Sequence, residues 1–370
     1  MKVGILTSSR ADYGIYLPLL NKIKEDGFFE LEIIAFGTHL SLSHGYTLSE
    51  IKKHNYKKIH TISSLISNDD EQSIATSYGL TLLKFSEFWQ QNKFDLVLCL
   101  GDRFEMSAAV QAGIPFNVKF AHIHGGETTL GAIDNIYRHQ ISLASNLHFT
   151  ASEIFSDRIV DLIGNKENVF AVGSLSLNEI KNFQPINKTE FYEKFNIPNQ
   201  DFALITFHPE TVNIEMNQTF ASEMRKALSH FTSKLFLVIT MPNADTMGSI
   251  FRMEIESLKK EFTSQVICIE NFGKENYFSA MYYTKVLIGN TSSGIIEAAS
   301  FGKYVVNVGD RQKGRMQSGN IINTPFSQQE IIEAVNDSLV KEKYTGKNNY
   351  YNQHSVNLII NHIKKFNEVV

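Results

Sequence analysis

The stretch FDLVLCLGDRFE at residues 94–105 is the clearest example of a sequence pattern that recurs along the chain and indicates its fold. Apolar residues fill Leu96 to Leu100, and a glycine with two charged residues comes directly after them. A short apolar run between turn signals is typical of a strand that is buried on both faces. A strand, a polar turn and a helix in succession are the unit of a parallel sheet. The stretch therefore predicts an α/β protein.

The same alternation runs through the chain of 370 residues. In the first half we expect strands at Lys2 to Thr7, Leu31 to Phe36, Ile59 to Ile62, Phe94 to Leu100, Val118 to Ile123, Leu147 to Ala151 and Val169 to Val172. A turn-rich linker is expected at 182–199, which contains two prolines. The pattern then restarts, with strands expected at Phe202 to Phe207, Leu235 to Thr240, Val266 to Ile269, Lys285 to Gly289 and Lys303 to Val308.

This organisation predicts two doubly wound, Rossmann-like domains with a ligand-binding cleft between them. We place the first domain at 1–182 and the second at 183–350. Beyond Pro325 only helices are expected, at 328–342 and 356–367. The last segment, 351–370, is expected to pack back on the first domain.

The composition excludes a disordered or collagen-like protein. A net charge of −4 with 43% hydrophobic residues is typical of an ordinary globular protein and gives no reason to expect a nucleic-acid or membrane partner. Cys99 and Cys268 lie in apolar runs, which indicates buried reduced thiols. No signal peptide is recognised, and no run reaches the roughly 20 apolar residues of a membrane span. We therefore expect a cytoplasmic protein with a small partner.

Polar motifs follow the expected strands, where open parallel sheets bind their ligands. After the first strand, Arg10 supplies a cation beside Asp12, a possible helix cap, at a helix N-terminus that would attract an anion. His39 follows the second strand and is as readily structural as functional. A GxGxxG motif is missing here, which argues against a dinucleotide cofactor.

Acidic residues follow the fourth and fifth strands. Asp102, Glu127 and Asp134 would bring three carboxylates to one edge of the sheet, with Arg103 and Arg138 beside them. Mutual repulsion and partial burial would raise at least one carboxyl pKa toward neutrality, as acid/base catalysis requires. The alternative is a helix cap with a charge pair.

A metal site at this edge is the alternative interpretation. His122 and His124 would share one strand face, but no third ligand occurs at a recognisable spacing. We therefore expect neither a metal nor another cofactor.

The second half carries motifs that suit a phosphorylated ligand. His208 closes the first strand of this half, and Asn290, Ser292, Ser293 and Gly294 lie where a helix would begin, an arrangement suited to a diphosphate. Glu297, one turn further, could accept hydrogen bonds from a ribose diol. Of 35 basic residues only 8 are arginines, yet five of them (Arg10, Arg103, Arg138, Arg311 and Arg315) lie in the strand-end motifs. This placement favours an anionic ligand, because the guanidinium matches phosphate geometry.

Taken together and in order, these motifs resemble those of the UDP-N-acetylglucosamine 2-epimerases, which have the two-domain GT-B-type fold. The ordered set is Arg10-Ala-Asp12-Tyr, Gly101-Asp102-Arg103, His122-Ile-His-Gly-Gly-Glu127, Phe207-His208-Pro209, Gly289-Asn290-Thr-Ser-Ser-Gly294 and Arg311-Gln-Lys-Gly-Arg315. The opening RADYG resembles the hydrolysing branch, because the other branch typically has Arg-Pro-Glu there.

The resemblance implies a reaction and the residues for it. UDP would leave a UDP-linked 2-acetamido sugar to give a 2-acetamidoglucal, and water would then add with inversion at C2. Asp102, Glu127 and Asp134 would supply the acid/base groups and His208 would assist the departure of UDP. Arg10, Ser292, Ser293 and Arg311 would bind the diphosphate, and Glu297 the ribose. Many relatives have a glutamate where this chain has His124, so both His124 and Glu127 are candidates for that glutamate's role.

The resemblance leaves the sugar open. UDP-N-acetylglucosamine, which would give N-acetylmannosamine for sialic acid synthesis, is the first expectation, and the UDP-linked N,N'-diacetylbacillosamine of legionaminic acid synthesis is the alternative. A GT-B glycosyltransferase and a non-catalytic UDP-sugar binder are the alternatives from other classes. A homodimer or homotetramer is expected from the relatives.

Overall fold

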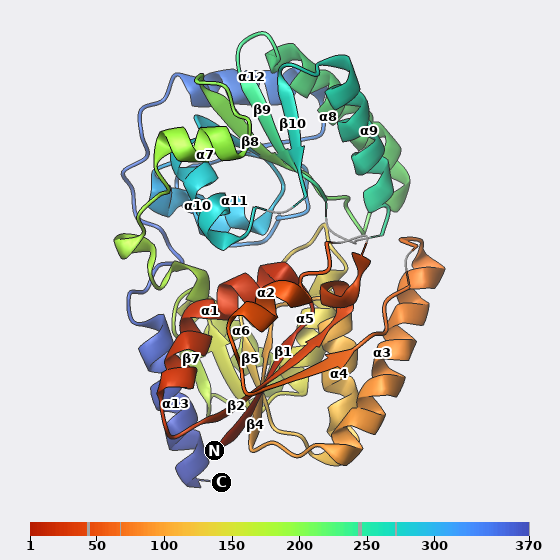
Figure 1. The fold of residues 1–370 in the computed structure, drawn as a ribbon, viewed down its shortest axis with the longest axis vertical. Coiled ribbons are helices and arrows are strands. Elements are labelled where there is room, and N and C mark those ends of the chain that lie inside the picture. The colour runs from red at the N-terminus through yellow and green to blue at the C-terminus, as the bar shows by residue number, and fades with distance from the viewer. Residues whose placement is uncertain (43–44, 67, 243–245, 271, 370) are drawn as a thin grey trace. The chain divides into compact units, whose positions relative to one another are not determined.

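The computed structural model describes residues 1–42, 45–66, 68–242, 246–270 and 272–369, and it contains two compact units (Figure 1). Unit 1 comprises Met1–Glu127, Asp134–Lys181 and Tyr350–Val370, and unit 2 comprises Thr128–Ile133 and Asn182–Asn349. Within the expected domain of 1–182, Asn182 and the short segment 128–133 belong to unit 2. The backbone of this segment forms its hydrogen bonds there, with Leu130 N donating to Lys313 O and Thr211 N donating to Gly131 O.

The sheet of unit 1 is parallel throughout, in the order β3-β2-β1-β4-β5-β6-β7. Its strands agree closely with the apolar runs of the sequence, and β4 and β5 are buried along their whole length. They are β1 (Lys2–Thr7), β2 (Glu30–Phe36), β3 (Lys58–Ile62), β4 (Leu96–Leu100), β5 (Phe120–Ile123), β6 (Leu147–Thr150) and β7 (Val169–Ala171).

Helices cover this sheet because each presents an apolar face to it. They are α1 (Arg10–Glu25), α2 (Leu48–Lys53), α3 (Glu71–Gln91), α4 (Phe104–Gly113), α5 (Asp134–Leu143), α6 (Glu153–Ile163) and α13 (Ser355–Val369). Short 3₁₀ turns lie at η1 (Gly37–Leu40), η3 (Ile114–Phe116), η4 (Leu175–Leu177) and η5 (Ile180–Asn182).

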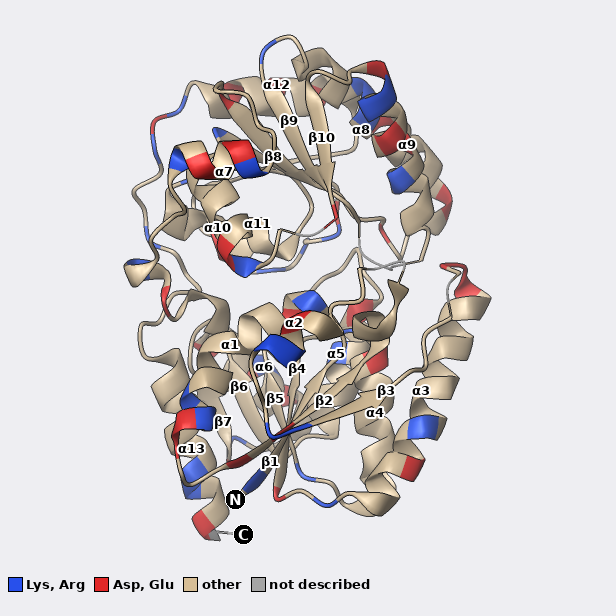
Figure 2. Ribbon diagram, viewed as in Figure 1, with Lys and Arg blue, Asp and Glu red and all other residues tan. Residues whose placement is uncertain are grey.

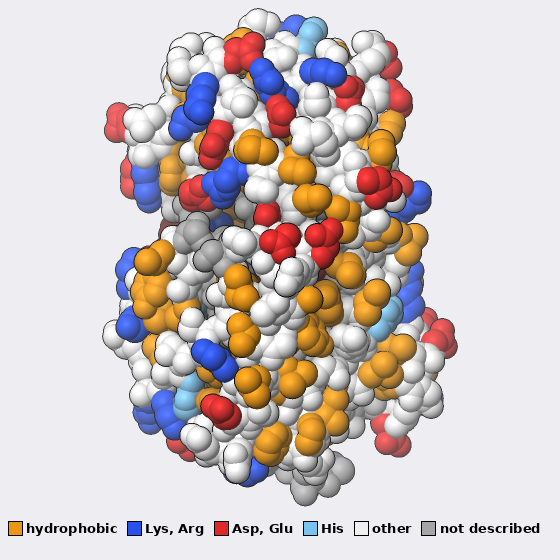
Figure 3. Space-filling view, turned by 90° about the vertical axis from the view of Figure 1, so that its right-hand side faces the viewer, with side chains coloured by type: hydrophobic (Ala, Val, Ile, Leu, Met, Phe, Trp, Pro, Cys, Tyr) orange, Lys and Arg blue, Asp and Glu red, His pale blue; other side chains and the backbone are white. Residues whose placement is uncertain are grey.

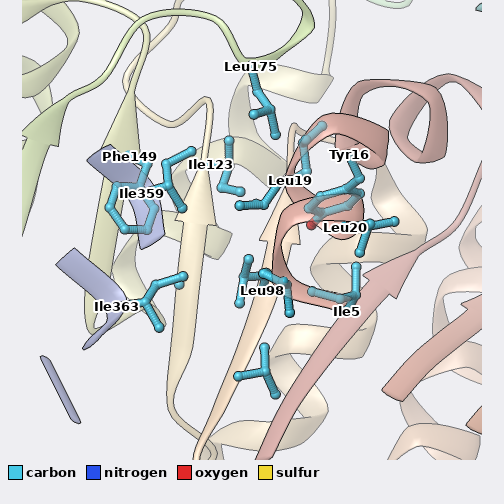
Figure 4. Close-up of a cluster of buried hydrophobic side chains, with 14 of the residues drawn as sticks. Ile5, Tyr16, Leu19, Leu20, Leu98, Ile123, Phe149, Leu175, Ile359 and Ile363 are labelled. Carbon is cyan, nitrogen blue, oxygen red and sulfur yellow. The ribbon is translucent and has the colours of Figure 1, made fainter. Parts of the chain in front are cut away.

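The C-terminal helix α13 completes one of the two cores of unit 1. Ile359 and Ile363 are fully buried in the same cluster as Ile5, Leu19 and Phe149, so the end of the chain packs against its beginning (Figure 4). Burying an isoleucine side chain contributes about 1.5–3 kcal/mol. The second core lies under α3 and α4 and contains Trp89.

The sheet of unit 2 is also parallel, in the order β10-β9-β8-β11-β12-β13. Its strands are β8 (Phe202–Thr206), β9 (Phe236–Thr240), β10 (Val266–Ile269), β11 (Val286–Gly289), β12 (Val305–Val308) and β13 (Ile321–Thr324). The sequence did not predict β13, which is a short edge strand with only two apolar residues. The predicted class, α/β with two Rossmann-like domains, is confirmed.

The helices of unit 2 include one that the sequence had assigned to a linker. The helix α7 is capped by the side chain of Asn187, which accepts hydrogen bonds from Thr189 N and Glu190 N. The helices are α7 (Lys188–Lys194), α8 (Asn217–Phe231), α9 (Gly248–Glu261), α10 (Lys274–Tyr283), α11 (Ser292–Ile296) and α12 (Gln328–Leu339), with 3₁₀ turns η6 (Ile214–Met216) and η7 (Ala298–Phe301).

The surface mixes charges of both signs. Figure 2 shows Lys and Arg interspersed with Asp and Glu along α8 and α9. Apolar side chains are also exposed on the side of unit 1 where α3 runs (Figure 3), and they include Leu83 of α3, which is 58% exposed. Across the described ranges, the structure has no helix long and apolar enough to cross a membrane.

Candidate functional site

The topology marks one place in each sheet where a ligand is expected. The strand order reverses between β1 and β4 in unit 1, and between β8 and β11 in unit 2. Ligands of open α/β sheets bind at such a reversal, beyond the carboxyl ends of the strands. The four loops at these ends begin with Ser8, Gly101, Phe207 and Asn290. Four of the predicted motifs therefore lie at the two topological switch points, and the others follow β2, β5 and β12.

The loop after β1 is held by a buried network around Asp12. Ser9 caps α1, and Asp12 completes a capping box three residues later rather than being the cap itself. Its carboxylate accepts hydrogen bonds from the backbone N–H of Ser9 and, at 2.5 Å, from the Thr7 hydroxyl. Burial alone would raise the pKa of Asp12, but the contacts from His39, Thr7 and Ser8 outweigh burial and lower it.

His39 belongs to the same network. Because the Thr7 hydroxyl donates to Asp12, it can only accept from His39, whose Nε2 lies 2.9 Å away. The other ring nitrogen, Nδ1, is 2.7 Å from the Thr47 hydroxyl. His39 is fully buried, so these contacts fix the loops after β1 and β2. Arg10, by contrast, is half-buried at the first residue of α1.

Arg103 is engaged by its neighbour in the loop after β4. Its Nε and one terminal nitrogen donate to the two oxygens of Glu105, at 3.1 and 2.9 Å. Glu105 is fully buried, so this bidentate pair anchors the start of α4. The sequence groups Arg103 with the ligand-binding arginines, and the structure shows it paired with Glu105 in the first turn of α4.

Arg138 lies at the centre of the acidic cluster. Its guanidinium forms an ion pair with Asp102, donates to the carbonyl oxygen of Glu127 at 2.8 Å and donates to Asn135 at 3.1 Å. The side chain of Arg138 is 1% exposed, whereas that of Asp102 is 24% exposed. Asp134 lies four residues before Arg138, on the same face of α5. Arg138 of α5, the helix that begins with Asp134, therefore connects the loops that bear Asp102 and Glu127.

The turn after β5 brings the two candidates for the family glutamate together. His124 has a φ of 67°, unusual for a residue other than glycine. Its Nε2 accepts a hydrogen bond from Leu175 N at 3.3 Å, so the neutral ring carries its proton on Nδ1. That atom is 3.6 Å from Glu127 Oε1. Both side chains are buried, so the two candidates lie side by side in this turn.

In unit 2, the loop after β8 is rigidly held. The side-chain amide of Asn290 accepts from His208 N at 2.7 Å and donates to His208 O at 2.9 Å. Two residues after His208, the side-chain amide of Asn217 accepts a hydrogen bond from Glu210 N at 3.0 Å and donates one to Glu210 O at 2.8 Å. Asn290 thus connects the loops after β8 and β11, and Asn217 is a supporting residue that the sequence analysis missed.

The loop after β12 packs on the same region. Arg311 donates to the carbonyl oxygen of Pro209 at 2.5 Å, and Gln312 donates to Asn290 O at 2.8 Å. Glu210 accepts from Asp310 N at 2.6 Å, and burial raises the pKa of this carboxyl group. Arg311 thus binds the backbone of the residue after His208, and the same loop carries Arg315, which is half-buried.

The start of α11 holds the predicted diphosphate-binding residues. Ser292 is exposed, Gly294 is buried against β12, and the Ser293 hydroxyl is 2.6 Å from the Tyr277 hydroxyl. Burial raises the pKa of Tyr277 to about 12, so its hydroxyl stays protonated. Glu297 is 5% exposed at the end of α11. Tyr277 was not predicted, because one tyrosine in a helical pattern gives no functional signal.

From the sequence, no metal site is expected at His122 and His124. Within the parts of the chain that the structure describes, no group of three His, Cys, Asp or Glu side chains is arranged to hold a metal ion. Both ring nitrogens of His122 lie within hydrogen-bond distance of protein groups, the carbonyl oxygen of Gly101 and the hydroxyl of Ser142.

Comparison with known proteins gives consistent matches over most of the chain. A family model described as UDP-N-acetylglucosamine 2-epimerase matches residues 21–364. The GDP/UDP-N,N'-diacetylbacillosamine 2-epimerase (hydrolyzing) of Campylobacter jejuni is 35% identical over 327 residues, 88% of this chain and 85% of the relative. The UDP-N,N'-diacetylbacillosamine 2-epimerase (hydrolyzing) of Legionella pneumophila is 32% identical over 351 residues, 94% of this chain and 92% of the relative.

A solved structure supports the fold. The crystal structure of the UDP-GlcNAc 2-epimerase from Neisseria meningitidis bound to UDP-GlcNAc matches with a TM-score of 0.81 and 16% identity, covering 99% of this chain and 100% of that chain. At this identity the likeness concerns the fold alone, two Rossmann-like α/β domains of the GT-B-like plan predicted from the sequence.

Proposed function

Because the chain belongs to the UDP-N-acetylglucosamine 2-epimerase family, we propose that it is a hydrolysing 2-epimerase acting on a UDP-linked 2-acetamido sugar. The products are UDP and the free sugar with the opposite configuration at C2. The observation that carries the proposal is the buried Arg138, which pairs with Asp102 and holds the backbone of Glu127. Such a cluster suits proton transfer at carbon better than it suits the transfer of a sugar to an acceptor.

In the first step a carboxylate of unit 1 removes the C2 proton. The electrons of the C2–H bond form the C1–C2 double bond, the bond from C1 to the diphosphate oxygen breaks, and UDP leaves. In the second step water adds its oxygen to C1, and a proton is delivered to the other face of C2. Asp102, Glu127 and Asp134 are proposed as the acid/base groups. His124 lies against Glu127, with its Nδ1 3.6 Å from Glu127 Oε1.

Departure of UDP needs stabilisation of the developing negative charge, which fixed donors provide. We assign the diphosphate to the start of α11, with Ser292 and Ser293, and to Arg10, Arg311 and Arg315. His208 is proposed to assist the leaving group, and Glu297 to hold the ribose. Support comes from the fixed loop of unit 2 that carries His208, because the side chain of Asn290 forms hydrogen bonds with both the N–H and the carbonyl of His208.

The relatives favour the diacetylated sugar. Two hydrolysing relatives at 35% and 32% identity are both named for N,N'-diacetylbacillosamine. We therefore propose its UDP conjugate as the substrate. UDP-N-acetylglucosamine, the first expectation from the sequence, is the second candidate because the matching family is described by it.

The test offers both UDP-sugars to the purified protein in separate tubes with EDTA present, and proton NMR identifies the products. We expect free UDP and a free manno-configured sugar, faster from the diacetylated substrate. Asp102→Asn is the control for a contaminating hydrolase, and it must lose the activity. If UDP is bound but neither sugar reacts, the proposal fails and a glycosyltransferase or a non-catalytic UDP-sugar binder takes its place.

We also propose that the protein forms a homodimer or homotetramer. Support comes from apolar side chains exposed on α3 and α5, where Leu83, Ile136 and Leu143 are each more than half exposed. Light scattering behind a sizing column would show twice or four times the mass of one chain. A mass equal to one chain at micromolar concentration would refute this part of the proposal.

A further inference from the structure

His122 is a buried histidine at the edge of the acidic cluster, and the proposed reaction gives it no role. It lies in β5 with no exposed surface, between Cys99 of β4 and His148 of β6 in the sheet register. Its Nε2 is 2.8 Å from the carbonyl oxygen of Gly101, and its Nδ1 is 2.9 Å from the hydroxyl of Ser142.

These two partners determine the state of the imidazole ring. A carbonyl oxygen can only accept a hydrogen bond, so Nε2 must carry a proton. The hydroxyl of Ser142 can donate, so Nδ1 can be the acceptor of a neutral ring. Burial, the largest influence, lowers the pKa of His122 to about 3, so the ring stays neutral at physiological pH. A histidine in this state cannot shuttle protons, but it is a fixed hydrogen-bond donor.

The Nε2–H group of His122 donates to the carbonyl oxygen of Gly101, the residue before the predicted catalytic acid Asp102. Gly101 has a φ of 80°, in the left-handed region that favours glycine, and Asp102 follows it directly. The Gly101 N–H donates to Ile123 O at 3.0 Å, so β5 holds both polar backbone groups of Gly101. One contact comes from the backbone of β5 and the other from the side chain of His122.

We propose that His122 is a positioning residue for Asp102: its neutral ring fixes the carbonyl of Gly101, while Arg138 fixes the carboxylate. The inference rests on the proposed function, because it assumes that the Asp102 carboxylate acts on the substrate. His122 touches no reacting atom in this arrangement. Misplacing a reacting group by about 1 Å can cost about a hundredfold in rate, so loss of the contact should lower kcat.

The fold supplies a matched control, His148. It lies beside His122 in the sheet register and is 1% exposed, and burial lowers its pKa to about 4. Its Nδ1 has no hydrogen-bond partner within the described residues. His148 thus shares the burial and the neutral state of His122 but not the bond to Gly101. Replacing either residue perturbs the same core.

The experiment compares His122→Leu, His122→Gln and His148→Leu with the wild type in UDP release. We expect His122→Leu to lower kcat at least tenfold while KM and the Kd for UDP stay within about twofold. His122→Gln should recover most of kcat, because its amide N–H can donate to the same carbonyl. His148→Leu should lose stability but keep kcat within about threefold.

Each outcome decides one question. Equal losses of kcat in His122→Leu and His148→Leu, or no recovery in His122→Gln, would overturn the positioning role alone. A wild type that releases no UDP from either sugar would overturn the proposed function and this inference with it. A second readout does not require active variants: ¹⁵N NMR of the wild-type imidazole should show the Nε2–H tautomer from pH 5 to 8. A protonated ring or the Nδ1–H tautomer would contradict the inference.

Discussion

Replacing Arg138 by methionine tests the buried cation on which the acidic cluster depends. Methionine keeps an unbranched apolar stem of similar length, so the main loss is electrostatic. Removing one partner of a buried ion pair costs about 3–5 kcal/mol, and the partial exposure of Asp102 favours the lower end. The carbonyl of Glu127 also loses its donor, which adds about 1 kcal/mol. We expect the free energy of unfolding to fall by about 4 kcal/mol.

The assay is urea unfolding followed by tryptophan fluorescence. Trp89 is the only tryptophan in the sequence and is buried in unit 1, so its emission reports on the unit that contains Arg138. Lys53→Met is the control, because the ion pair of Lys53 with Glu50 is exposed and contributes less than about 1 kcal/mol. If Arg138→Met destabilises unit 1 no more than this control does, the structural role assigned to Arg138 is wrong.

Three further predictions use the same protein. Asp102→Asn should lower turnover by at least about a hundredfold while the calorimetric Kd for UDP is unchanged, and a rate near that of the wild type would remove Asp102 from the mechanism. Ile359→Ala should cost unit 1 about 2–5 kcal/mol by Trp89 fluorescence, since it opens a cavity under α13, and a loss below about 1 kcal/mol would contradict this packing. The free energy of unfolding of unit 1 should fall as the pH is lowered from 6 to 4, because His122 and His148 bind protons near pH 6.5 in the unfolded chain but only near pH 3 and 4 in the folded one. The variant with glutamine at both positions should show a weaker dependence of this free energy on pH. An unchanged dependence would refute the lowered pKa values of the two histidines.

Much of the fold could be predicted because buried parallel strands are continuous apolar runs. The strand predicted at Phe94 to Leu100 appears as β4, which begins two residues later, at Leu96. The edge strand β13 could not be found, because half of its residues are polar and its burial is partial. The helix α7 was hidden by flanking prolines, although Asn187 is a recognisable cap. Assignment of 128–133 to unit 2 depends on hydrogen bonds to residues far along the chain, which no local pattern indicates.

The candidate site was found because its residues follow strand ends, whose position in a parallel sheet is known from topology alone. The contact partners of each side chain could not be predicted from topology. Arg103 and Arg138 have equal weight in the sequence, yet Arg103 pairs with Glu105 two residues away, whereas Arg138 joins two loops. Partners such as Asn217 and Tyr277 are ordinary residues whose role comes only from tertiary contacts.

The most direct test of the central claim is the isotope content of the sugar released in D₂O. Elimination removes the C2 proton and hydration delivers a new one from solvent, so we predict one deuterium at C2 of the free manno-configured sugar, together with unlabelled UDP. A released sugar that keeps its original hydrogen at C2 and the gluco configuration would show simple hydrolysis and would contradict the proposed 2-epimerase.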